Sequence, residues 1–308
     1  MKYTVIGAGG TGGCIGGYLA KAGCDVTLIA RGEHLEAIKS GGLCVNSARV
    51  GNFNVKGIHA CTMEDYEGTP DVIFVCVKYY SLPDAVGFIK KHAASDTVVI
   101  PVLNVFGTGG MLQKECSGCV ILDGCIYIMS MIERPGVISQ PTPIFRLFFG
   151  YRSGQEKRLE EKVLKIVDDC SNAQIETHYT DNILRDALQK FSFVSPMGVA
   201  GLYYDATGKD FLVKGEPQDT FFELVREVCK LGNAMGITFD EDLVEVNRVI
   251  MEGLTPDSTT SMQRDVKKGG MSEIDGLLHR IVRLAQEYNV SLPTYEKISD
   301  WAKEKGIK

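Results

Sequence analysis

Six residues near the N-terminus, Gly7-Ala8-Gly9-Gly10-Thr11-Gly12, have types and spacing that suit a phosphate ligand. The first glycine permits a tight turn, the third residue lets a pyrophosphate approach the backbone, and the sixth lets a helix pack closely on a strand. A short apolar run, residues 3–6, precedes the motif, and a small-residue helical pattern follows it. A helix that begins there offers N–H groups and a partial positive charge to an anion. The motif therefore predicts a dinucleotide-binding turn.

The end of the second apolar run, residues 26–30, bears on which dinucleotide binds. NAD-binding units usually place Asp or Glu there to bond the ribose 2′-hydroxyl. This chain has Arg31 instead. Because this position carries no acidic side chain, nothing there would repel a 2′-phosphate, and the Arg31 guanidinium can form an ion pair with it. Arg31 therefore favours NADP(H) over NAD(H), although a solvated loop cation would leave the cofactor open.

Lys190 is a candidate for proton transfer. On a helical wheel it falls with Ile183, Ala187 and Val194, at the edge of an apolar stripe. A lysine there either extends its ammonium group to water or is partly desolvated. Desolvation lowers a lysine pKa and suits the group to proton transfer. Position alone favours the extended, solvated side chain.

Three further polar residues have both a structural and a chemical interpretation. Glu273 precedes an apolar helical stripe, where it could be a favourable charge at a helix N-terminus beside a capping pair, Ser272 and Asp275. Ser261, twelve residues earlier, could equally be an N-cap. Asn104 follows a buried strand, which places it at the sheet edge where ligands bind, although loop asparagines commonly form turns.

The elements that must position these residues change character near Asp181. Before it, strand-length apolar runs predict strands, and two stretches between them predict helices, 81–91 and 159–167. The runs span residues 4–6, 26–29, 72–77, 98–102, 120–127, 136–139, 145–150 and 174–178. After it, apolar residues recur at helical spacing. We predict an α/β domain of Rossmann type over residues 1–181 and a helical substrate domain over 182–308, with the active site in a cleft between them.

The composition is that of an ordinary globular protein. The 308 residues are 44% hydrophobic and 23% charged, which suits one or two domains with a sizeable core. A net charge of −6 and the absence of basic runs beyond Lys267-Lys268 argue against nucleic-acid binding. No apolar run reaches the roughly 18 residues of a membrane span. Charges at Lys21 and Asp25 do not fit a signal peptide.

The ten cysteines predict a reducing, cytoplasmic compartment, because they are scattered and several lie within strand patterns. Cys116 and Cys119 form one C-x-x-C motif, with Cys125 nearby. A second cysteine pair is missing and no histidine pair has metal spacing, so buried or loop thiols are expected rather than a metal site.

Several segments resemble the ketopantoate reductase family (2-dehydropantoate 2-reductases of ApbA/PanE type) over nearly the whole chain. They are GAGGTG, VCVKYYSL, VLNVFG, the LQK at residues 188–190, and TSMQRDVKKGGMSEIDGLLHRIVRLAQEYNVSLPT, which is the most specific. The resemblance implies a Rossmann-type domain followed by an all-α domain similar to the C-terminal domain of 6-phosphogluconate dehydrogenase. It implies NADPH-dependent reduction of ketopantoate to pantoate, in pantothenate and coenzyme A biosynthesis.

The resemblance also implies residue roles. Lys190 matches the catalytic lysine, which hydrogen-bonds the substrate ketone and supplies its proton. Glu273 matches the acid that orients the substrate, and Ser261 a residue that helps hold its carboxylate. Asn104 matches an asparagine near the nicotinamide, and so belongs to both the substrate and the cofactor set. The residues expected to bind the cofactor are Gly7, Ala8, Gly9, Gly10, Thr11, Gly12, Arg31, Lys78 and Asn104.

One departure from the family pattern concerns the helix after Lys190. Family members usually carry asparagines four and eight residues after the lysine, whereas this chain has Val194 and Gly198. Pro196 lies between them, removes a backbone donor and should kink or end the helix. Ser192 or Ser195 could replace one lost substrate contact. Because a lost bond to a substrate hydroxyl weakens discrimination strongly, the chain need not prefer ketopantoate.

Two other functions stay open beside this one. The first is a reductase of the same fold for another 2-keto acid or an imine. The second is a catalytically idle, NADP-binding regulatory protein, against which the joint retention of Lys190 and Glu273 argues. The expected partner is a small keto acid, and an apolar face of the helical domain could support a homodimer.

Overall fold

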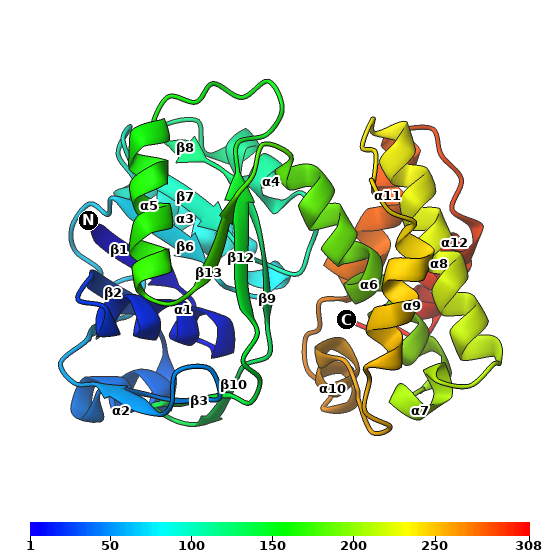
Figure 1. Cartoon of the computed structure of the whole chain (residues 1–308), viewed down its shortest axis with the longest axis horizontal. Helices are drawn as coiled ribbons and strands as arrows, with labels where there is room; N and C mark the ends of the chain where they lie inside the picture. Colours follow the sequence, from blue (N-terminus) through cyan, green and yellow to red (C-terminus); the bar gives the residue numbers. More distant parts are fainter. The chain divides into compact units, whose positions relative to one another are not determined.

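The computed structural model describes residues 1–308 and divides them into two compact units. Unit 1 comprises Met1–Leu103 and Gly107–Ile183, and unit 2 comprises Asn104–Phe106 and Leu184–Lys308. Unit 1 is α/β and unit 2 is helical, which confirms the predicted fold class (Figure 1). The three residues Asn104–Phe106 group with the helical unit, which no sequence pattern indicates.

The elements of unit 1 follow one another as strands with interposed helices. The strands are β1 (Lys2–Ile6), β2 (Asp25–Ile29), β3 (Leu43–Ser47), β4 (Phe53–Val55), β5 (His59–Cys61), β6 (Val72–Val75), β7 (Val98–Pro101), β8 (Val120–Ile121), β9 (Asp123–Ile128), β10 (Met131–Arg134), β11 (Val137–Gln140), β12 (Phe145–Gly150) and β13 (Glu176–Tyr179). The helices are α1 (Gly10–Lys21), α2 (Gly32–Gly41), the 3-10 turn η1 (Tyr79–Ser81), α3 (Leu82–His92), α4 (Thr108–Glu115) and α5 (Glu160–Asn172).

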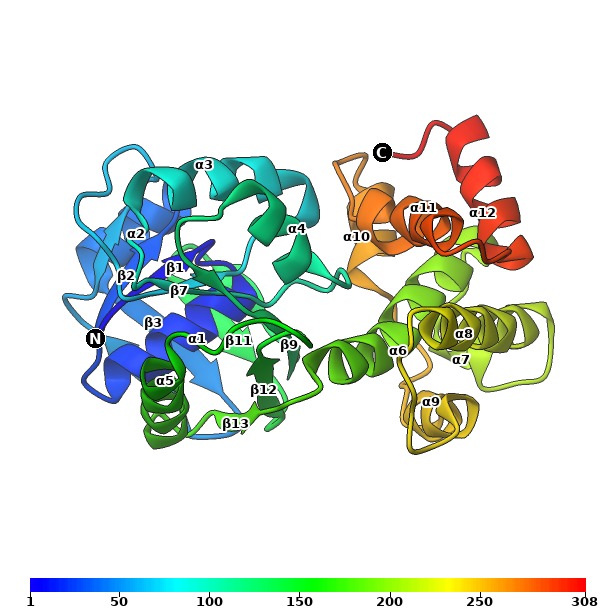
Figure 2. The same ribbon diagram turned by 90° about the horizontal axis from the view of Figure 1, so that it is seen from above.

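The main sheet of unit 1 is parallel, with strand order β5-β2-β1-β6-β7-β8. Successive residues of β6 alternate between its two faces. Val72 and Phe74 pack in one apolar cluster with α1 and α5, and Ile73 and Val75 pack in another with α3 and α4. The sheet accordingly lies between α3 and α4 on one side and α1 and α5 on the other (Figure 2). Burial on both faces explains why the strands read as continuous apolar runs.

Two smaller sheets complete unit 1, with strand orders β10-β11-β3-β4 and β13-β12-β9. The predicted single strand over 120–127 is wrong, because β8 pairs with β7 whereas β9 pairs with β12 of a different sheet. The sequence also gives no signal for β3, β4, β5 or β10. These strands are short or carry polar residues, and β10 is exposed along its whole length.

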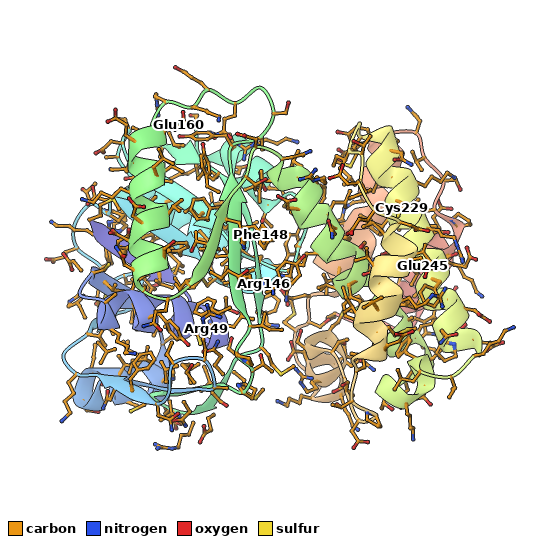
Figure 3. The ribbon with its side chains drawn as sticks, viewed as in Figure 1. Arg49, Arg146, Phe148, Glu160, Cys229 and Glu245 are labelled. Carbon is orange, nitrogen blue, oxygen red and sulfur yellow. The ribbon has the colours of Figure 1, made fainter.

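Strand β12 shows how the three-stranded sheet presents one face outward. Phe145, Leu147 and Phe149 are buried, whereas Arg146 and Phe148 point away from the core (Figure 3). Arg146 forms an ion pair with Glu176 of β13, and Phe148 stacks on His178 with 4.4 Å between ring centroids. Such cross-strand pairs hold the register of β12 and β13.

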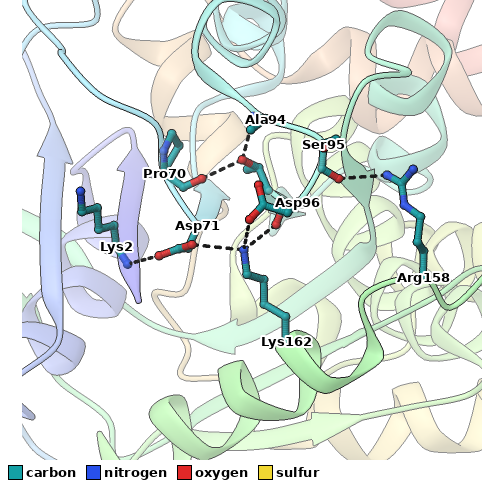
Figure 4. Close-up of polar contacts among 9 residues, drawn as sticks. Lys2, Pro70, Asp71, Ala94, Ser95, Asp96, Arg158 and Lys162 are labelled. Carbon is teal, nitrogen blue, oxygen red and sulfur yellow. Dashed lines mark hydrogen bonds and ion pairs between the residues drawn. The ribbon is translucent and has the colours of Figure 1, made fainter.

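Helix α5 is tied to the amino ends of the central strands by Lys162. Its Nζ lies 3.1 Å from Asp71 Oδ1 and 3.2 Å from Asp96 Oδ2, and Asp71 also accepts the backbone N–H of Lys2 (Figure 4). This network lies opposite the carboxyl ends of the strands, so it stabilises the sheet without lining the glycine turn.

Unit 2 is built from helices. They are α6 (Ile183–Tyr204), α7 (Gly208–Phe211), α8 (Glu216–Ala234), α9 (Leu243–Glu252), α10 (Ser261–Lys267), the π-helical turn η2 (Asp275–His279), α11 (Arg280–Glu287) and α12 (Pro293–Glu304). Of the two outcomes predicted for Pro196, ending the helix does not occur, because α6 continues to Tyr204. Every residue from 195 to 201 is buried. Tertiary packing of this segment offsets the backbone hydrogen bond that proline cannot make.

The cysteines are all free thiols. Cys116 and Cys119 are buried in the apolar cluster beneath α3, and burial raises the pKa of the Cys119 thiol to about 11. No group of three or more His, Cys, Asp or Glu residues is placed to hold a metal ion. No helix is long and apolar enough to cross a membrane.

Candidate functional site

The glycine turn of unit 1 has the geometry that its spacing predicts. Gly7 has a φ of +93°, which favours glycine, and a Cβ at Gly12 would collide with the carbonyl oxygen of Gly7. A Cβ at Gly9 would meet nothing within 4 Å. Gly9 is also the N-cap of α1 and supplies no side-chain cap. The backbone therefore faces open space at the N-terminus of α1, which fits a phosphate group.

Gly10, the fourth glycine of the motif, excludes a side chain for a different reason. A Cβ at Gly10 would lie 2.5 Å from the carbonyl oxygen of Ser130, on the segment that leads into β10. Gly10 therefore allows this segment to cross the start of α1, a requirement of the tertiary structure that the G-x-G-x-x-G spacing does not contain.

A pocket of about 790 Å³ lies beside the turn. One side of its lining comes from the residues that follow β1 (Gly7 to Gly9), β2 (Ala30 and Arg31) and β6 (Cys76 to Lys78). These are the carboxyl ends of neighbouring parallel strands, at the point where the strand order reverses. Ligands of open α/β sheets bind at such a point, and the volume suits a small-molecule cofactor.

The pocket carries charges of both signs. Arg31, Lys78 and Lys91 supply cations, and Glu64 and Asp84 supply carboxylates. Arg31 is exposed at the N-cap of α2, and Lys78 is the N-cap of η1, three residues after the end of β6. The structure therefore brings the two predicted basic residues to the same pocket as the glycine turn, together with Lys91, which sequence analysis did not single out.

His34, on α2, also contacts the turn and was not predicted. The backbone N–H of Gly136 donates to its Nδ1 at 3.1 Å, so the proton of the neutral ring resides on Nε2 and is donated to the Ala8 carbonyl at 2.9 Å. Burial lowers the pKa of His34. The neutral ring thus joins the glycine turn to the β10–β11 hairpin, and no local spacing rule would reveal this link.

Lys190 of unit 2 is buried, with 9% of its surface exposed. Its Nζ donates a hydrogen bond of 2.7 Å to Asn104 Oδ1. The solvated lysine that position alone favours is therefore wrong, and the desolvated alternative describes the structure. An ammonium group held in this way can donate both a hydrogen bond and a proton to a neighbouring oxygen.

Asn104 reaches Lys190 because its segment packs on the helices of unit 2. The Phe106 ring lies 6.2 Å from that of Phe191, one residue after Lys190, and the Phe106 carbonyl accepts a hydrogen bond from Arg280 Nε. The three residues Asn104–Phe106 are therefore placed by α6 and α11.

Glu273 is 3% exposed and lies just before the π-helical turn. It is thus no surface charge at a helix end. The predicted capping pair also differs, because Asp275 forms a two-bond ion pair with Arg283 at 2.8 and 2.9 Å. This Arg283 contact holds the pKa of the Asp275 carboxyl below its usual range. Ser272 Oγ accepts the backbone N–H of Ile274, as the capping interpretation expects, and donates its own proton to the Lys308 carbonyl.

Ser261 is the first residue of α10 and is half-buried. The N-cap interpretation of Ser261 is wrong, because Thr260 is the N-cap and forms a capping box with Gln263. Gln263 Nε2 in turn donates to the carbonyls of Gly201 and Ala206, which ties α10 to the end of α6.

Ser192 and Ser195 are fully buried and their protons are used within unit 2. Ser192 donates to the Gln189 carbonyl, and Ser195 donates to the Leu277 carbonyl. Neither hydroxyl has a second proton for a substrate. We therefore do not carry Ser195, predicted as a substrate-binding residue, into the proposed substrate site.

Comparison with known proteins covers both units. Residues 3–154 match the family model described as ketopantoate reductase PanE/ApbA, and residues 182–306 match the model of its C-terminal part. The chain belongs to the ketopantoate reductase family. A 2-dehydropantoate 2-reductase from Pyrococcus abyssi (strain GE5 / Orsay) is 30% identical over 298 residues, which cover 95% of this chain and 94% of that protein.

Solved structures share the fold of this chain. A 2-dehydropantoate 2-reductase from Methylococcus capsulatus has a TM-score of 0.87 at 23% identity, covering 99% of this chain and 97% of that one. The ternary structure of D-mandelate dehydrogenase with NADH and anilino(oxo)acetate has a TM-score of 0.87 at 22% identity, covering 100% of both chains. The same fold therefore occurs in oxidoreductases named for different substrates, 2-dehydropantoate and D-mandelate.

Proposed function

We propose that this member of the ketopantoate reductase family is an NADPH-dependent reductase of 2-oxo acids, with 2-dehydropantoate as the first candidate substrate. The observation that carries the proposal is the buried Lys190 ammonium held 2.7 Å from Asn104 Oδ1. The Pyrococcus abyssi relative, which bears the name of this activity, supports the substrate.

The residues of the glycine turn and its pocket fit the dinucleotide. The N-terminus of α1 and the open space above Gly9 would hold its pyrophosphate. Arg31 and Lys78 would pair with a 2′-phosphate, which is the basis for choosing NADPH over NADH. When bound, the reduced nicotinamide supplies a hydride to the ketone carbon.

The residues of unit 2 would complete the reduction. The Lys190 ammonium donates a hydrogen bond to the ketone oxygen and then a proton as alkoxide charge develops there. Asn104 holds the ammonium in place. Glu273 would orient the substrate and the Ser261 hydroxyl would bind its carboxylate. A buried ammonium is well suited to this role, because electrostatic interactions strengthen where water is excluded.

The test is a steady-state assay of NADPH oxidation with 2-dehydropantoate, using the wild-type protein and the Glu273→Gln variant. We expect turnover by the wild type and a large loss in the variant, with NADPH binding unchanged. Tight NADPH binding without consumption of any 2-oxo acid would contradict the proposal and favour an idle, regulatory cofactor-binding protein.

A second candidate function is the reduction of a 2-oxo acid without a side-chain hydroxyl. A Cβ at Gly198 would lie 3.2 Å from Cε of the buried Met262 and 3.9 Å from Cδ1 of Leu277. Met262 thus occupies the space into which a side chain at 198 would project. With Val194 one turn earlier, the helix face beyond Lys190 offers apolar rather than hydrogen-bonding groups.

The two candidates are separated by comparing kcat/KM for 2-dehydropantoate and for 3-methyl-2-oxobutanoate, which lacks the hydroxymethyl group. A preference for 2-dehydropantoate supports the first candidate. Equal or greater efficiency with the unhydroxylated acid supports the second, because a site built to bond a hydroxyl rejects the analogue that lacks it.

A further inference from the structure

Three elements of unit 2 meet at the buried Ser195 hydroxyl. Ser195 lies on α6, and its Oγ donates to the carbonyl of Leu277 in the π-helical turn at 2.6 Å. The hydroxyl of Tyr295, on α12, lies 2.7 Å from the same Oγ. Ser195 and Tyr295 are both 0% exposed. The junction is therefore closed to solvent.

The direction of these bonds follows from the proton count. Burial raises the pKa of the Tyr295 phenol, so the group keeps its proton. The single hydroxyl proton of Ser195 is already in the hydrogen bond to the Leu277 carbonyl, so in the second bond the Tyr295 hydroxyl must be the donor and Ser195 Oγ the acceptor. Tyr295 is itself fixed, because the Glu227 carboxylate of α8 accepts the backbone N–H groups of Thr294 and Tyr295 at 2.8 and 3.0 Å.

The junction connects the two residues to which the proposed function assigns chemistry. Ser195 lies five residues after Lys190 on the same helix. Leu277, which accepts the Ser195 proton, donates its own N–H to the Glu273 carbonyl at 2.9 Å. One side-chain hydroxyl thus links the helix of Lys190 to the turn that follows Glu273.

We propose that Ser195 is a positioning residue, whose hydrogen bond to the Leu277 carbonyl holds the π-helical turn and thereby sets Glu273 relative to Lys190. This inference rests on the proposed function of those two residues.

The hydrogen bond from Ser195 to Leu277 affects the orientation of Glu273 because the turn is π-helical. The N–H of Arg280 reaches back five residues to the Asp275 carbonyl, so the turn contains one residue more than an α-helical turn. Reversion to an α-helix would rotate Glu273 by about 100° relative to α11, since an α-helix has 3.6 residues per turn. A bond from outside the helix to a carbonyl within the turn opposes that reversion.

Two variants separate positioning from general stability. Ser195→Ala removes the donor to Leu277, whereas Tyr295→Phe removes a buried hydroxyl of the same junction and leaves the bond from Ser195 to Leu277 in place. Both should lower the melting temperature, since Ser195→Ala deletes two buried hydrogen bonds, to Leu277 and from Tyr295, and Tyr295→Phe deletes the second of these alone. We expect Ser195→Ala to reduce kcat with the 2-oxo acid by about 10- to 100-fold, the cost of a small misplacement of reacting groups. We expect Tyr295→Phe to keep wild-type kcat, and Ser195→Cys, which retains a weak donor, to recover part of the loss.

A second readout does not depend on turnover. Amide hydrogen exchange of the protein without ligands should become faster in residues 274–281 of Ser195→Ala and not in Tyr295→Phe. Equal exchange and equal kcat in the two variants would overturn the positioning role and leave Ser195 a structural tie. A wild-type protein that reduces no 2-oxo acid would refute the proposed function, whereas the exchange comparison would still test the turn.

Discussion

The glycine turn of unit 1 and the Lys190 region of unit 2 are built on opposite principles. At the turn, backbone atoms make the site, and side chains are absent because they would collide or block a ligand. Around Lys190, side chains make the site, and its hydrogen-bonded partner Asn104 lies 86 residues away in the sequence. We therefore expect the glycine turn to be impaired by side chains added to it, and the Lys190 region to be impaired by the removal of side chains.

This contrast predicts the largest effect at Lys190. We expect Lys190→Ala to lower kcat/KM for the 2-oxo acid by about 10²- to 10⁴-fold, the usual contribution of general acid catalysis. NADPH affinity, measured by fluorescence titration, should not change. The control is Lys214→Ala at an exposed lysine of the same unit, which should retain full activity. Comparable activity of the two variants would remove Lys190 from the mechanism.

The turn can be tested at two glycines that differ in their surroundings. Gly12→Ala places a Cβ against the Gly7 carbonyl, so the free energy of unfolding should fall by about 1–3 kcal/mol. Gly9→Ala meets nothing within 4 Å, so the melting temperature should stay the same. NADPH should nevertheless bind at least about tenfold more weakly to Gly9→Ala, a loss of about 1.4 kcal/mol. Wild-type NADPH affinity in Gly9→Ala would show that no phosphate approaches this part of the backbone.

Arg31 should set the preference between the two nicotinamide cofactors. We expect Arg31→Ala to weaken NADPH binding by about 1.5–3 kcal/mol, the range for a hydrogen bond to a charged group. NADH binding should change little. Lys39→Ala, at an exposed lysine of α2, the helix that Arg31 precedes, is the control for net charge. If NADPH and NADH affinities fall equally, Arg31 does not recognise the 2′-phosphate.

The smallest effect is expected at Asp275, beside Glu273. Because Arg283 lowers its folded-state pKa below the ordinary value of 3.8, the ion pair stabilises the fold above that value, and this stabilisation is lost as the pH falls through the lowered pKa. Wild-type stability should therefore decline more steeply than that of Asp275→Asn as the pH drops below about 5. The difference should be small, since both side chains are half-exposed. Parallel melting curves of the two proteins across that range would argue against the pair.

The predictability of the site follows the same contrast. Gly7, Gly9 and Gly12 could be read from their spacing because each answers a requirement within one strand, turn and helix. His34 could not, since its two partners, Ala8 and Gly136, lie on other elements. Ser195 shows the limit more sharply. Its sequence position suggested a substrate contact, but burial between α6, the π-helical turn and α12 directs its proton to Leu277.

The fold was predictable to a similar degree. Long apolar runs identified the central strands, and helical spacing identified unit 2. Short or polar strands such as β3 and β10 were not predicted, because their apolar pattern is weak and β3 forms hydrogen bonds with β11, far away in the sequence.

By itself, the sequence determined the dinucleotide turn, the order of α/β and helical parts, and the resemblance that named Lys190 and Glu273. These depend on local backbone freedom and on the periodicity of burial, which each segment carries alone. Only the tertiary structure decided that Lys190 is desolvated, that Thr260 rather than Ser261 caps α10, and that α6 continues through Pro196. Burial and hydrogen-bond partners are properties of a side chain's neighbours, and those neighbours come from distant parts of the chain.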